Sequence, residues 1–252
     1  MAKEEAPKKN VIAEYLQLVI SVVVIVFVVR SFIFEPFRIP SPSMDPTLKT
    51  GDYVIVTKFS YGFGRQSIFD IPIIGDRILW REPKRGNVVV FADPVTPRQK
   101  KLIKRVVGVP GDTIEMRDSQ LFINGVMAQR DYIGPGSSNA DIETSGNFFL
   151  ETFESQNGKP HEHVIWDKYP SAMFDNFGPY TVPEDHLFFM GDNRDNSSDS
   201  RSGSLRAVHR KYVMGRAQFV LFSLNIEQMP NRRNKWNRTN PFRWGRFLKG
   251  IR

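Results

Sequence analysis

Residues 101–112 read KLIKRVVGVPGD, a β-branched run that ends in a Pro-Gly-Asp turn. A run of this kind favours a β-strand, and Pro-Gly is a turn signal. Similar runs rich in β-branched and aromatic residues occur on both sides of this stretch. We expect strands at 52–59, 87–91, 101–109, 121–123, 187–190 and 212–221. Asn124-Gly125 adds a hairpin turn signal. Because no long amphipathic helix and no internal repeat interrupts this pattern, the region after residue 50 is predicted to be all-β.

Residues 113–185 differ in composition from the segments on either side. They contain the turn-rich stretches GPGSSNADIETSGN and ESQNGKPHEH, with Phe and Tyr scattered between them. We therefore predict an inserted β-subdomain at 113–185. It divides a main β-domain that is built from residues 35–112 and 186–230.

Residues 11–34 read VIAEYLQLVISVVVIVFVVRSFIF and carry no charge between Tyr15 and Val29. As a helix, 24 residues would span roughly 36 Å, enough to cross a hydrocarbon core of about 30 Å. A cleavable signal peptide would need small residues after the apolar run, and RSFIF offers none of the usual kind. A buried core element would need an equally apolar partner nearby. We predict one retained transmembrane helix, preceded by a short terminus at 1–10, with an orientation that the Lys and Arg counts barely decide.

The formal net charge of +8 resides at one end of the chain. Segment 231–252 has six Arg, two Lys and no acidic residue, whereas the other 230 residues carry 27 charges of each sign. A neutral body argues against a broad nucleic-acid-binding face. The chain has no Cys, which excludes disulfides, thiolate catalysis and Cys-ligated metal sites.

The basic segment 231–252 also carries the aromatic residues Trp236, Phe242, Trp244 and Phe247. Aromatic and basic residues together suit an anionic lipid interface, and they also suit single-stranded nucleic acid. A solvated tail is a third possibility. Given the expected anchor, we predict contact with membrane lipids and no nucleic-acid partner.

Three polar segments stand out as candidate sites. The first is IPSPSMDPTL at 39–48, where Pro40, Pro42 and Pro46 stiffen the chain next to the expected membrane span. A rigidly held serine here suits a nucleophile, but taken alone the segment is more typical of a linker that follows a membrane helix.

The second segment places Lys104 in the expected strand 101–109, beside Ile103 and Val106. A lysine buried in such a strand has a lowered pKa and can act as a base. Lys100, Lys101 and Arg105 are neighbours, so an ordinary basic edge strand is the alternative.

The third segment, GDNRDNSSDSR at 191–201, is dense in short polar side chains that form turns and hydrogen-bond networks. A solvated loop is one alternative. A calcium loop is another, but Ser197 and Gly203 stand where an EF-hand from Asp192 needs Gly and Glu.

Taken together, and in this order and spacing, the three segments resemble the bacterial type I signal peptidase family. The anchor and the stretches GDYVIVTKFSYG, RGNVVVF and KRVVGVPGD extend the resemblance over essentially the whole chain. The resemblance implies a membrane-anchored serine endopeptidase without cofactor or metal. It implies that this enzyme removes signal peptides from exported pre-proteins through an acyl-enzyme intermediate.

The resemblance also implies residue roles. Ser43 is expected to be the nucleophile and Lys104 the general base. The Ser41 hydroxyl and the Ser43 N–H would bind the oxyanion, and Ser197 would orient the lysine amine. Asp199 and Arg201 would form a supporting ion pair, with Asp192 and Arg105 as further supporting residues.

Elementary chemistry agrees with such a Ser–Lys pair. A serine hydroxyl needs a base, and a lysine is a base only when its amine is neutral. Lowering a lysine pKa from about 10.4 to about 7 costs roughly 4–5 kcal/mol, which burial must supply. A hydroxyl such as that of Ser197 can hold the amine without stabilising its charged form, as a carboxylate would.

Because Ser43 lies nine residues after Phe34, the site is expected close to the bilayer. The family cuts after small side chains, in an Ala-x-Ala pattern, on the outer face of the cytoplasmic membrane. Residues 1–10 would then be cytoplasmic. The residues expected to line apolar substrate pockets are Phe37, Ile39, Met44, Leu48, Leu102 and Ile103.

The chain departs from the family pattern at Pro42, at Leu102 and after Arg201, which leaves the substrate preference open. A specialised peptidase with a narrow substrate set is one alternative, and a catalytically silent membrane-tethered binding protein is another. His161 and His163 share a strand face without a third ligand, so we expect them at the surface without a metal. His186 and His209 have no placed acid partner, which argues against a Ser–His–Asp triad.

Overall fold

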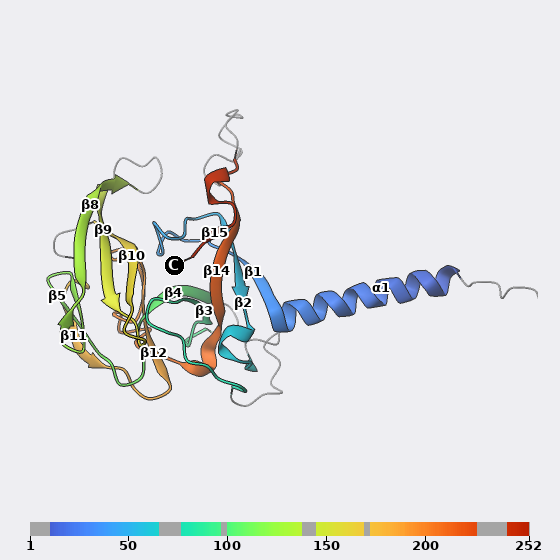
Figure 1. Cartoon of the computed structure of the whole chain (residues 1–252), viewed down its shortest axis with the longest axis horizontal. Coiled ribbons are helices and arrows are strands. Elements are labelled where there is room, and N and C mark those ends of the chain that lie inside the picture. Colours follow the sequence, from blue (N-terminus) through green and yellow to red (C-terminus); the bar gives the residue numbers. More distant parts are fainter. Residues whose placement is uncertain are drawn as a thin grey trace, which may run out of the picture.

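The computed structural model describes residues 11–65, 77–96, 100–137, 145–168, 172–225 and 241–251. The predicted terminus at 1–10 lies outside this part of the chain. Helix α1 (Val11–Val28) and a π-helical turn η1 (Val29–Ile33) project from a β-rich body (Figure 1). No residue of α1 is buried, and within the described residues α1 is the one helix long and apolar enough to cross a membrane. Strand β1 (Phe34–Arg38) follows at once, so the helical segment ends at Ile33 and not at residue 34 as predicted.

The main sheet has eight antiparallel strands in the order β1-β2-β14-β3-β4-β12-β13, with β15 paired to β14. Its further members are β2 (Asp52–Thr57), β3 (Val88–Ala92), β4 (Lys101–Gly108), β12 (His186–Met190), β13 (Val208–His209), β14 (Val213–Ser223) and β15 (Lys249–Gly250). Three single-turn helices, η2 (Phe59–Tyr61), η4 (Arg210–Tyr212) and η6 (Trp244–Arg246), connect or follow these strands. The prediction of an all-β body behind one N-terminal apolar helix is confirmed.

Strand β3 shows why a Val-rich run forms the centre of this sheet. All five of its residues are buried, because side chains that alternate along the strand enter cores on both faces. Val88 and Val90 belong to a first core, and Val89 and Phe91 belong to a second core. The first core also contains Ile39, Met44, Leu48, Val54, Val56, Met214, Ala217, Val220 and Ile251. The second core also contains Tyr61, Val106, Val109, Leu187, Phe189, Leu205, Val208 and Val213.

Two smaller sheets are formed by the strands between Thr113 and Thr181. One has the order β11-β5-β6-β7 and the other β10-β9-β8. Their members are β5 (Thr113–Arg117), β6 (Gln120–Ile123), β7 (Val126–Met127), β8 (Gln129–Ser137), β9 (Ser145–Glu154), β10 (Pro160–Asp167) and β11 (Phe177–Thr181). Asn124 and Gly125 both have positive φ between β6 and β7, as a primed hairpin turn requires. In Figure 1 these sheets lie on the side of the body away from α1.

The C-terminal residues 241–251, part of the predicted basic tail, are fixed to the body by two sets of contacts. Arg246 forms a buried ion pair with Asp52, and its Nη2 donates to the Thr47 carbonyl over 2.9 Å. Ile251 is buried in the first core, and its N–H donates to the Gln218 carbonyl over 2.9 Å. The segment therefore packs onto the main sheet, while residues 226–240, including Trp236, lie outside the described part.

Candidate active site

The loop between β1 and β2 carries Ser43 and is fixed at both ends. The Ile39 N–H donates to the Asp52 carbonyl over 2.8 Å, and the Gly51 N–H donates to the Ile39 carbonyl over 2.9 Å. Met44, next to Ser43, is fully buried in the first core. The serine is thus held between a tied loop and the core, and only 8% of its surface is exposed.

Lys104 reaches this serine from strand β4. Its Nζ lies 2.7 Å from Ser43 Oγ and 3.0 Å from the Ile103 carbonyl oxygen. The first distance falls in the range of about 2.6–3.2 Å that a nucleophile and its base need. The lysine is 3% exposed, so bulk water has little access to the amine.

Burial is also the main influence on the charge of this lysine. It lowers the pKa of Lys104 to about 8, against the opposing effect of the Asp199 and Asp192 carboxylates, while Lys100 lowers it further. Neither carboxylate forms an ion pair with the amine within the described residues, because each binds an arginine. At pH 7 about a tenth of the amine is therefore neutral and available as a base, a far larger share than for a lysine of ordinary pKa.

Ser41 lies next to the Ser43–Lys104 pair. Ser197 does not form the predicted hydrogen bond with the Lys104 amine. Ser41 Oγ is 3.3 Å from Ser43 Oγ. Ser197 is buried, and it contributes to lowering the pKa of Asp199. Among the described residues, however, its hydroxyl has no hydrogen bond of standard geometry. The Ile103 carbonyl makes the second contact to the lysine amine.

Two buried ion pairs lie behind the Ser–Lys pair. Arg105 Nε and Nη2 donate to the Asp192 carboxylate over 2.8 and 2.7 Å. Arg201 Nε and Nη2 donate to the Asp199 carboxylate over 3.0 and 2.9 Å, and this carboxylate also accepts the Gly191 N–H over 2.9 Å. Both bidentate pairs fix the backbone of the 191–201 segment against the site.

Sequence reasoning missed Asn193, although it lies in the 191–201 motif. Its side-chain amide donates to the Pro42 carbonyl over 3.1 Å, and its N–H donates to the Ser43 carbonyl over 3.2 Å. A Cβ at Gly191 would lie 2.5 Å from the Ser43 carbonyl oxygen, so only glycine permits this approach. The density of Asx residues was the available signal, but it did not single out Asn193.

A cavity of about 510 Å³ opens over the Ser43–Lys104 pair. Of the six residues predicted to form substrate pockets, Leu102 and Ile103 line it. Its other lining residues are Pro40, Ser41, Asp93, Val95, Lys100, Lys101, Asn196, Ser198, Ser204 and Leu205.

The other four predicted pocket residues lie elsewhere. Ile39, Met44 and Leu48 are buried in the first core, because the loop folds its apolar side chains inward beneath Ser43. Phe37 packs against the same core, and Lys101 Nζ lies 5.4 Å from the centre of its ring.

Comparison with known proteins places these observations in a family. Residues 12–222 match the family model "Signal peptidase, peptidase S26". The chain belongs to the signal peptidase (peptidase S26) family. It is 37% identical over 218 residues to signal peptidase I of Rickettsia typhi, covering 83% of this chain and 80% of the relative. It is 36% identical over 239 residues to signal peptidase I of Pseudomonas aeruginosa, covering 90% of this chain and 78% of the relative.

A solved signal peptidase I from Enterococcus faecalis matches with 25% identity and a TM-score of 0.31 over 54% of this chain and 97% of that chain. Family membership makes the chain a hydrolase of the serine peptidase class, and α1 fits a single-pass membrane anchor.

In this signal peptidase family member His163 of β10 is buried, contrary to the prediction of a surface residue, and His161 is partly buried. His163 is buried beside Glu151, which pairs with Arg194, and burial holds the pKa of His163 well below its ordinary value. His161 Nε2 lies 3.1 Å from Arg105 Nη1, and burial lowers the pKa of His161 to about 4. Both imidazoles are neutral at pH 7, and His161 helps to join β10 to the Arg105–Asp192 pair.

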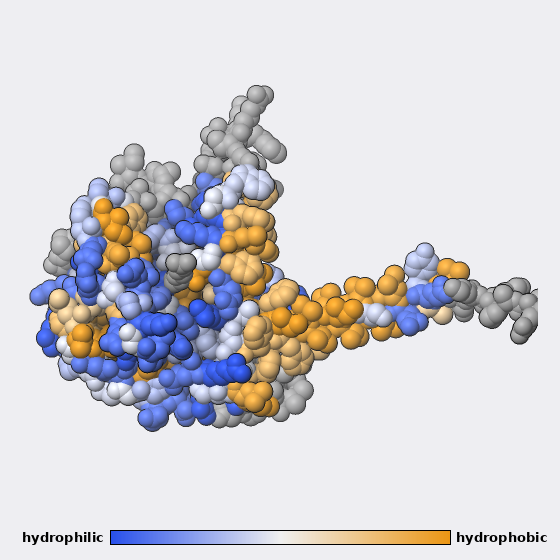
Figure 2. Space-filling view, viewed as in Figure 1, coloured by the Kyte–Doolittle hydropathy of each residue, from blue (hydrophilic) through white to orange (hydrophobic). Residues whose placement is uncertain are grey.

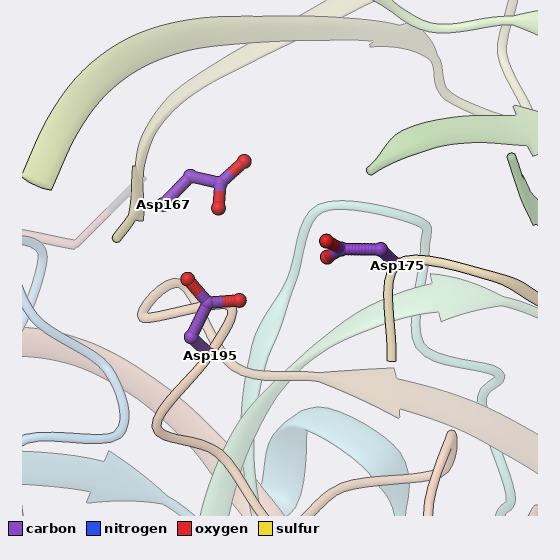
Figure 3. Close-up of side chains that lie close together, drawn as sticks. All are labelled: Asp167, Asp175 and Asp195. Carbon is purple, nitrogen blue, oxygen red and sulfur yellow. The ribbon is translucent and has the colours of Figure 1, made fainter. Parts of the chain in front are cut away.

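Three carboxylates, those of Asp167, Asp175 and Asp195, approach one another within 4.8 Å (Figure 3). Each already has a partner: Arg130 pairs with Asp167, while Asp175 accepts the Ala172 N–H and Asp195 accepts the Lys168 N–H, both over 2.6 Å. Burial raises the pKa of Asp167, with Asp195 acting in the same direction. One oxygen of each carboxylate is thus bound by the chain itself, and we assign no metal to this cluster.

Proposed function

We propose that this chain is a membrane-anchored serine endopeptidase that cleaves signal peptides from exported pre-proteins through a Ser43–Lys104 dyad. The observation that carries the proposal is the 2.7 Å contact between Ser43 Oγ and the buried Lys104 Nζ in a family of signal peptidases. A base whose amine is partly neutral at pH 7 can activate a serine without a histidine.

In the proposed reaction the neutral amine of Lys104 takes the proton from Ser43 Oγ as the oxygen attacks the scissile carbonyl carbon. The resulting oxyanion accepts hydrogen bonds from the Ser41 hydroxyl and the Ser43 N–H. The Lys104 ammonium then protonates the departing amine, which leaves Ser43 acylated by the signal peptide. A water molecule, deprotonated by Lys104, hydrolyses this ester and restores both side chains.

The surrounding residues would act by positioning these groups. The Ile103 carbonyl holds the amine of Lys104 at 3.0 Å. Asp192 with Arg105, and Asp199 with Arg201, would keep their own charges paired away from the amine, so that they do not hold it in its ammonium form. Ser197 would act through Asp199 and not through Lys104.

The arrangement also supports a substrate presented at a membrane. Strand β1 begins directly after η1, and the Ser43 loop follows β1, so few residues separate α1 from the cavity. We propose that Leu102 and Ile103 hold small side chains near the scissile bond. The catalytic domain, residues 35–112 and 186–230, would lie on the outer face of the cytoplasmic membrane, with the 113–185 insertion beyond it and residues 1–10 inside.

Cleavage of a pre-protein tests this function. The full chain in phospholipid vesicles is expected to release a mature protein, with the new N-terminus identified by mass spectrometry. Ser43→Ala should lower kcat/KM by about 10⁴-fold or more, because no other group supplies the nucleophile. Ser155→Ala, in the turn between β9 and β10, is the matched control and should leave cleavage unchanged. Processing by Ser43→Ala at the rate of the unaltered enzyme would refute the proposal.

We further propose that the C-terminal segment contacts lipid. Phe242, Trp244, Phe247 and Leu248 are exposed although they are apolar, and Arg243 and Lys249 lie among them. Figure 2 shows apolar surface on α1 that continues onto the adjoining side of the body, and more around the end of β14. Exposed aromatics flanked by cations are typical of the membrane–water interface.

Tryptophan quenching tests this contact. In vesicles that contain brominated lipids, the fluorescence of the full chain is expected to be quenched, and Trp244→Phe should remove a substantial part of that quenching. Trp166→Phe is the control, because Trp166 is fully buried in the body. Equal quenching with and without Trp244 would contradict lipid contact at this segment.

A further inference from the structure

One wall of the active-site cavity comes from a turn that follows the Asp199–Arg201 pair. The Ser202 N–H and hydroxyl both donate to the Asp199 carbonyl, over 2.9 and 2.6 Å. The Arg206 N–H donates to the Ser202 carbonyl over 3.2 Å, and the Leu205 N–H to the same carbonyl over 3.3 Å. The turn at 202–206 is therefore tied directly to the ion pair behind the dyad.

This turn delivers Leu205 into the cavity that contains Ser43 and Lys104. Leu205 is only 8% exposed, because most of its side chain packs in the second core with Leu187, Val106 and Phe189. A side chain held both by its turn and by a core has little freedom to move aside for a substrate.

Leu102 lies on the same side of the cavity. It packs against the second core, whereas its neighbour Ile103 packs against the first core on the opposite face of β4. Residues two apart on a strand share a face, so Leu102 points to the side of β4 that also carries Lys104. Leu102 and Leu205 thus form one apolar wall next to the amine, separate from the Ile103 side.

We infer that Leu205, together with Leu102, sets the size limit for one substrate side chain beside the scissile bond. This inference rests on the proposed function. The wall is apolar, although Ser204 and Asp93 also line the cavity, so a large apolar side chain that meets this wall is excluded by its size. A difference of one methylene in such a pocket changes kcat/KM by about 10–200-fold.

The experiment uses the full chain and a panel of pre-proteins. Each of the three residues on either side of the scissile bond is set in turn to Ala, Val or Leu, and the ratio of kcat/KM for Ala over Leu is measured. In Leu205→Ala this ratio is expected to fall at least tenfold at one position only. In Leu205→Phe the ratio at that same position should rise, because the larger Phe side chain leaves less room in the cavity for a substrate Leu.

Leu187→Ala is the matched control. Leu187 is buried in the same core but does not line the cavity, so its loss loosens the core without opening the wall. If Leu187→Ala shifts the ratio as much as Leu205→Ala does, the wall is not the determinant and the inference is wrong. If Leu205→Ala does not fold, Leu102→Ala opens the same wall from β4, and an unchanged ratio there overturns the inference.

The proposed function and this inference fail in different ways. If the unaltered chain processes none of the pre-proteins, the proposed function fails. If it processes them in a Ser43-dependent manner and the ratios of the Leu205 variants match those of the unaltered chain at every position, only the inference fails.

Discussion

Replacing Lys104 by Met is expected to abolish cleavage and to stabilise the fold at the same time. The Met side chain fills a similar volume but cannot accept the Ser43 proton, so kcat/KM should fall by about 10⁴-fold or more. The gain in stability has a different cause. Burial lowers the pKa of Lys104 from 10.5 to about 8, which means that the folded chain binds this proton less tightly than the unfolded chain.

The size of the expected gain in stability, and the pH range in which it appears, follow from the lowered pKa of Lys104. A difference of about 2.5 pKa units corresponds to about 3 kcal/mol at 1.36 kcal/mol per unit. The unfolded state binds more protons than the folded state between pH 8 and 10.5. The cost of burying Lys104 is therefore complete below about pH 8 and vanishes as the pH rises past about 10.5. Lys104→Met should raise the free energy of unfolding at pH 7 by up to about 3 kcal/mol, and by little at pH 11.

Denaturant unfolding in detergent at both pH values measures this gain, with Lys159→Met, an exposed lysine, as the control. In the unaltered enzyme, kcat/KM should rise about tenfold per pH unit up to about pH 8 and then level off, because the neutral amine is the base. If Lys104→Met is less stable than the unaltered enzyme at pH 7, burial of the Lys104 ammonium does not destabilise the fold and this prediction is wrong.

The strands could be predicted from the sequence because local signals determine them, whereas the expected Ser43–Lys104 pair came from the family resemblance and not from either segment alone. The Val-rich run of β3 predicts a strand, and Asn124-Gly125 predicts a hairpin turn, each from its own residues alone. The spacing of the Ser43, Lys104 and 191–201 segments identified the family. The strand and turn predictions required no knowledge of which distant residues meet.

The incorrect predictions depend on distant packing. Apolar residues beside Ser43 suit a substrate pocket and a core equally well, and the direction in which the loop folds placed Met44 in the core. His163 is buried next to Glu151 of β9 and Asp192 of the 191–201 segment, which its strand pattern alone does not reveal. The sequence places Arg246 in a basic tail, whereas in the structure Arg246 binds Asp52, 194 residues away. Charge composition records the number of cations but not their partners.

Removing the carboxylate of Asp199 is expected to lower the free energy of unfolding by about 3–5 kcal/mol, the range for breaking a buried ion pair. Asp199→Ala leaves the guanidinium of Arg201, only 1% exposed, without its counter-ion, and it leaves the Gly191 N–H without its acceptor. Because Gly191 lies against the Ser43 carbonyl, kcat/KM should fall as well. Denaturant unfolding and pre-protein cleavage measure the two effects.

The pH dependence of this loss identifies its cause. Burial alone would raise the pKa of Asp199, but the Arg201 guanidinium and the Gly191 N–H outweigh it, and the net pKa lies below the ordinary value. A lowered pKa contributes stability above the unfolded value of about 3.9, and this contribution is lost as the pH falls through the folded value. The difference between the unaltered enzyme and Asp199→Ala should therefore persist at pH 6–8 and shrink below about pH 4.

Two further variants separate the ion pair from a general packing defect. Glu115→Ala breaks the pair with Arg117, which is 59% exposed, and should change stability little because solvent screens that pair. The double variant Asp199→Ala/Arg201→Met removes both charges, so it should lose less stability than Asp199→Ala alone, since the orphaned guanidinium carries much of the cost. If the double variant is the less stable of the two, the loss comes from packing and hydrogen bonds and not from an unpaired charge.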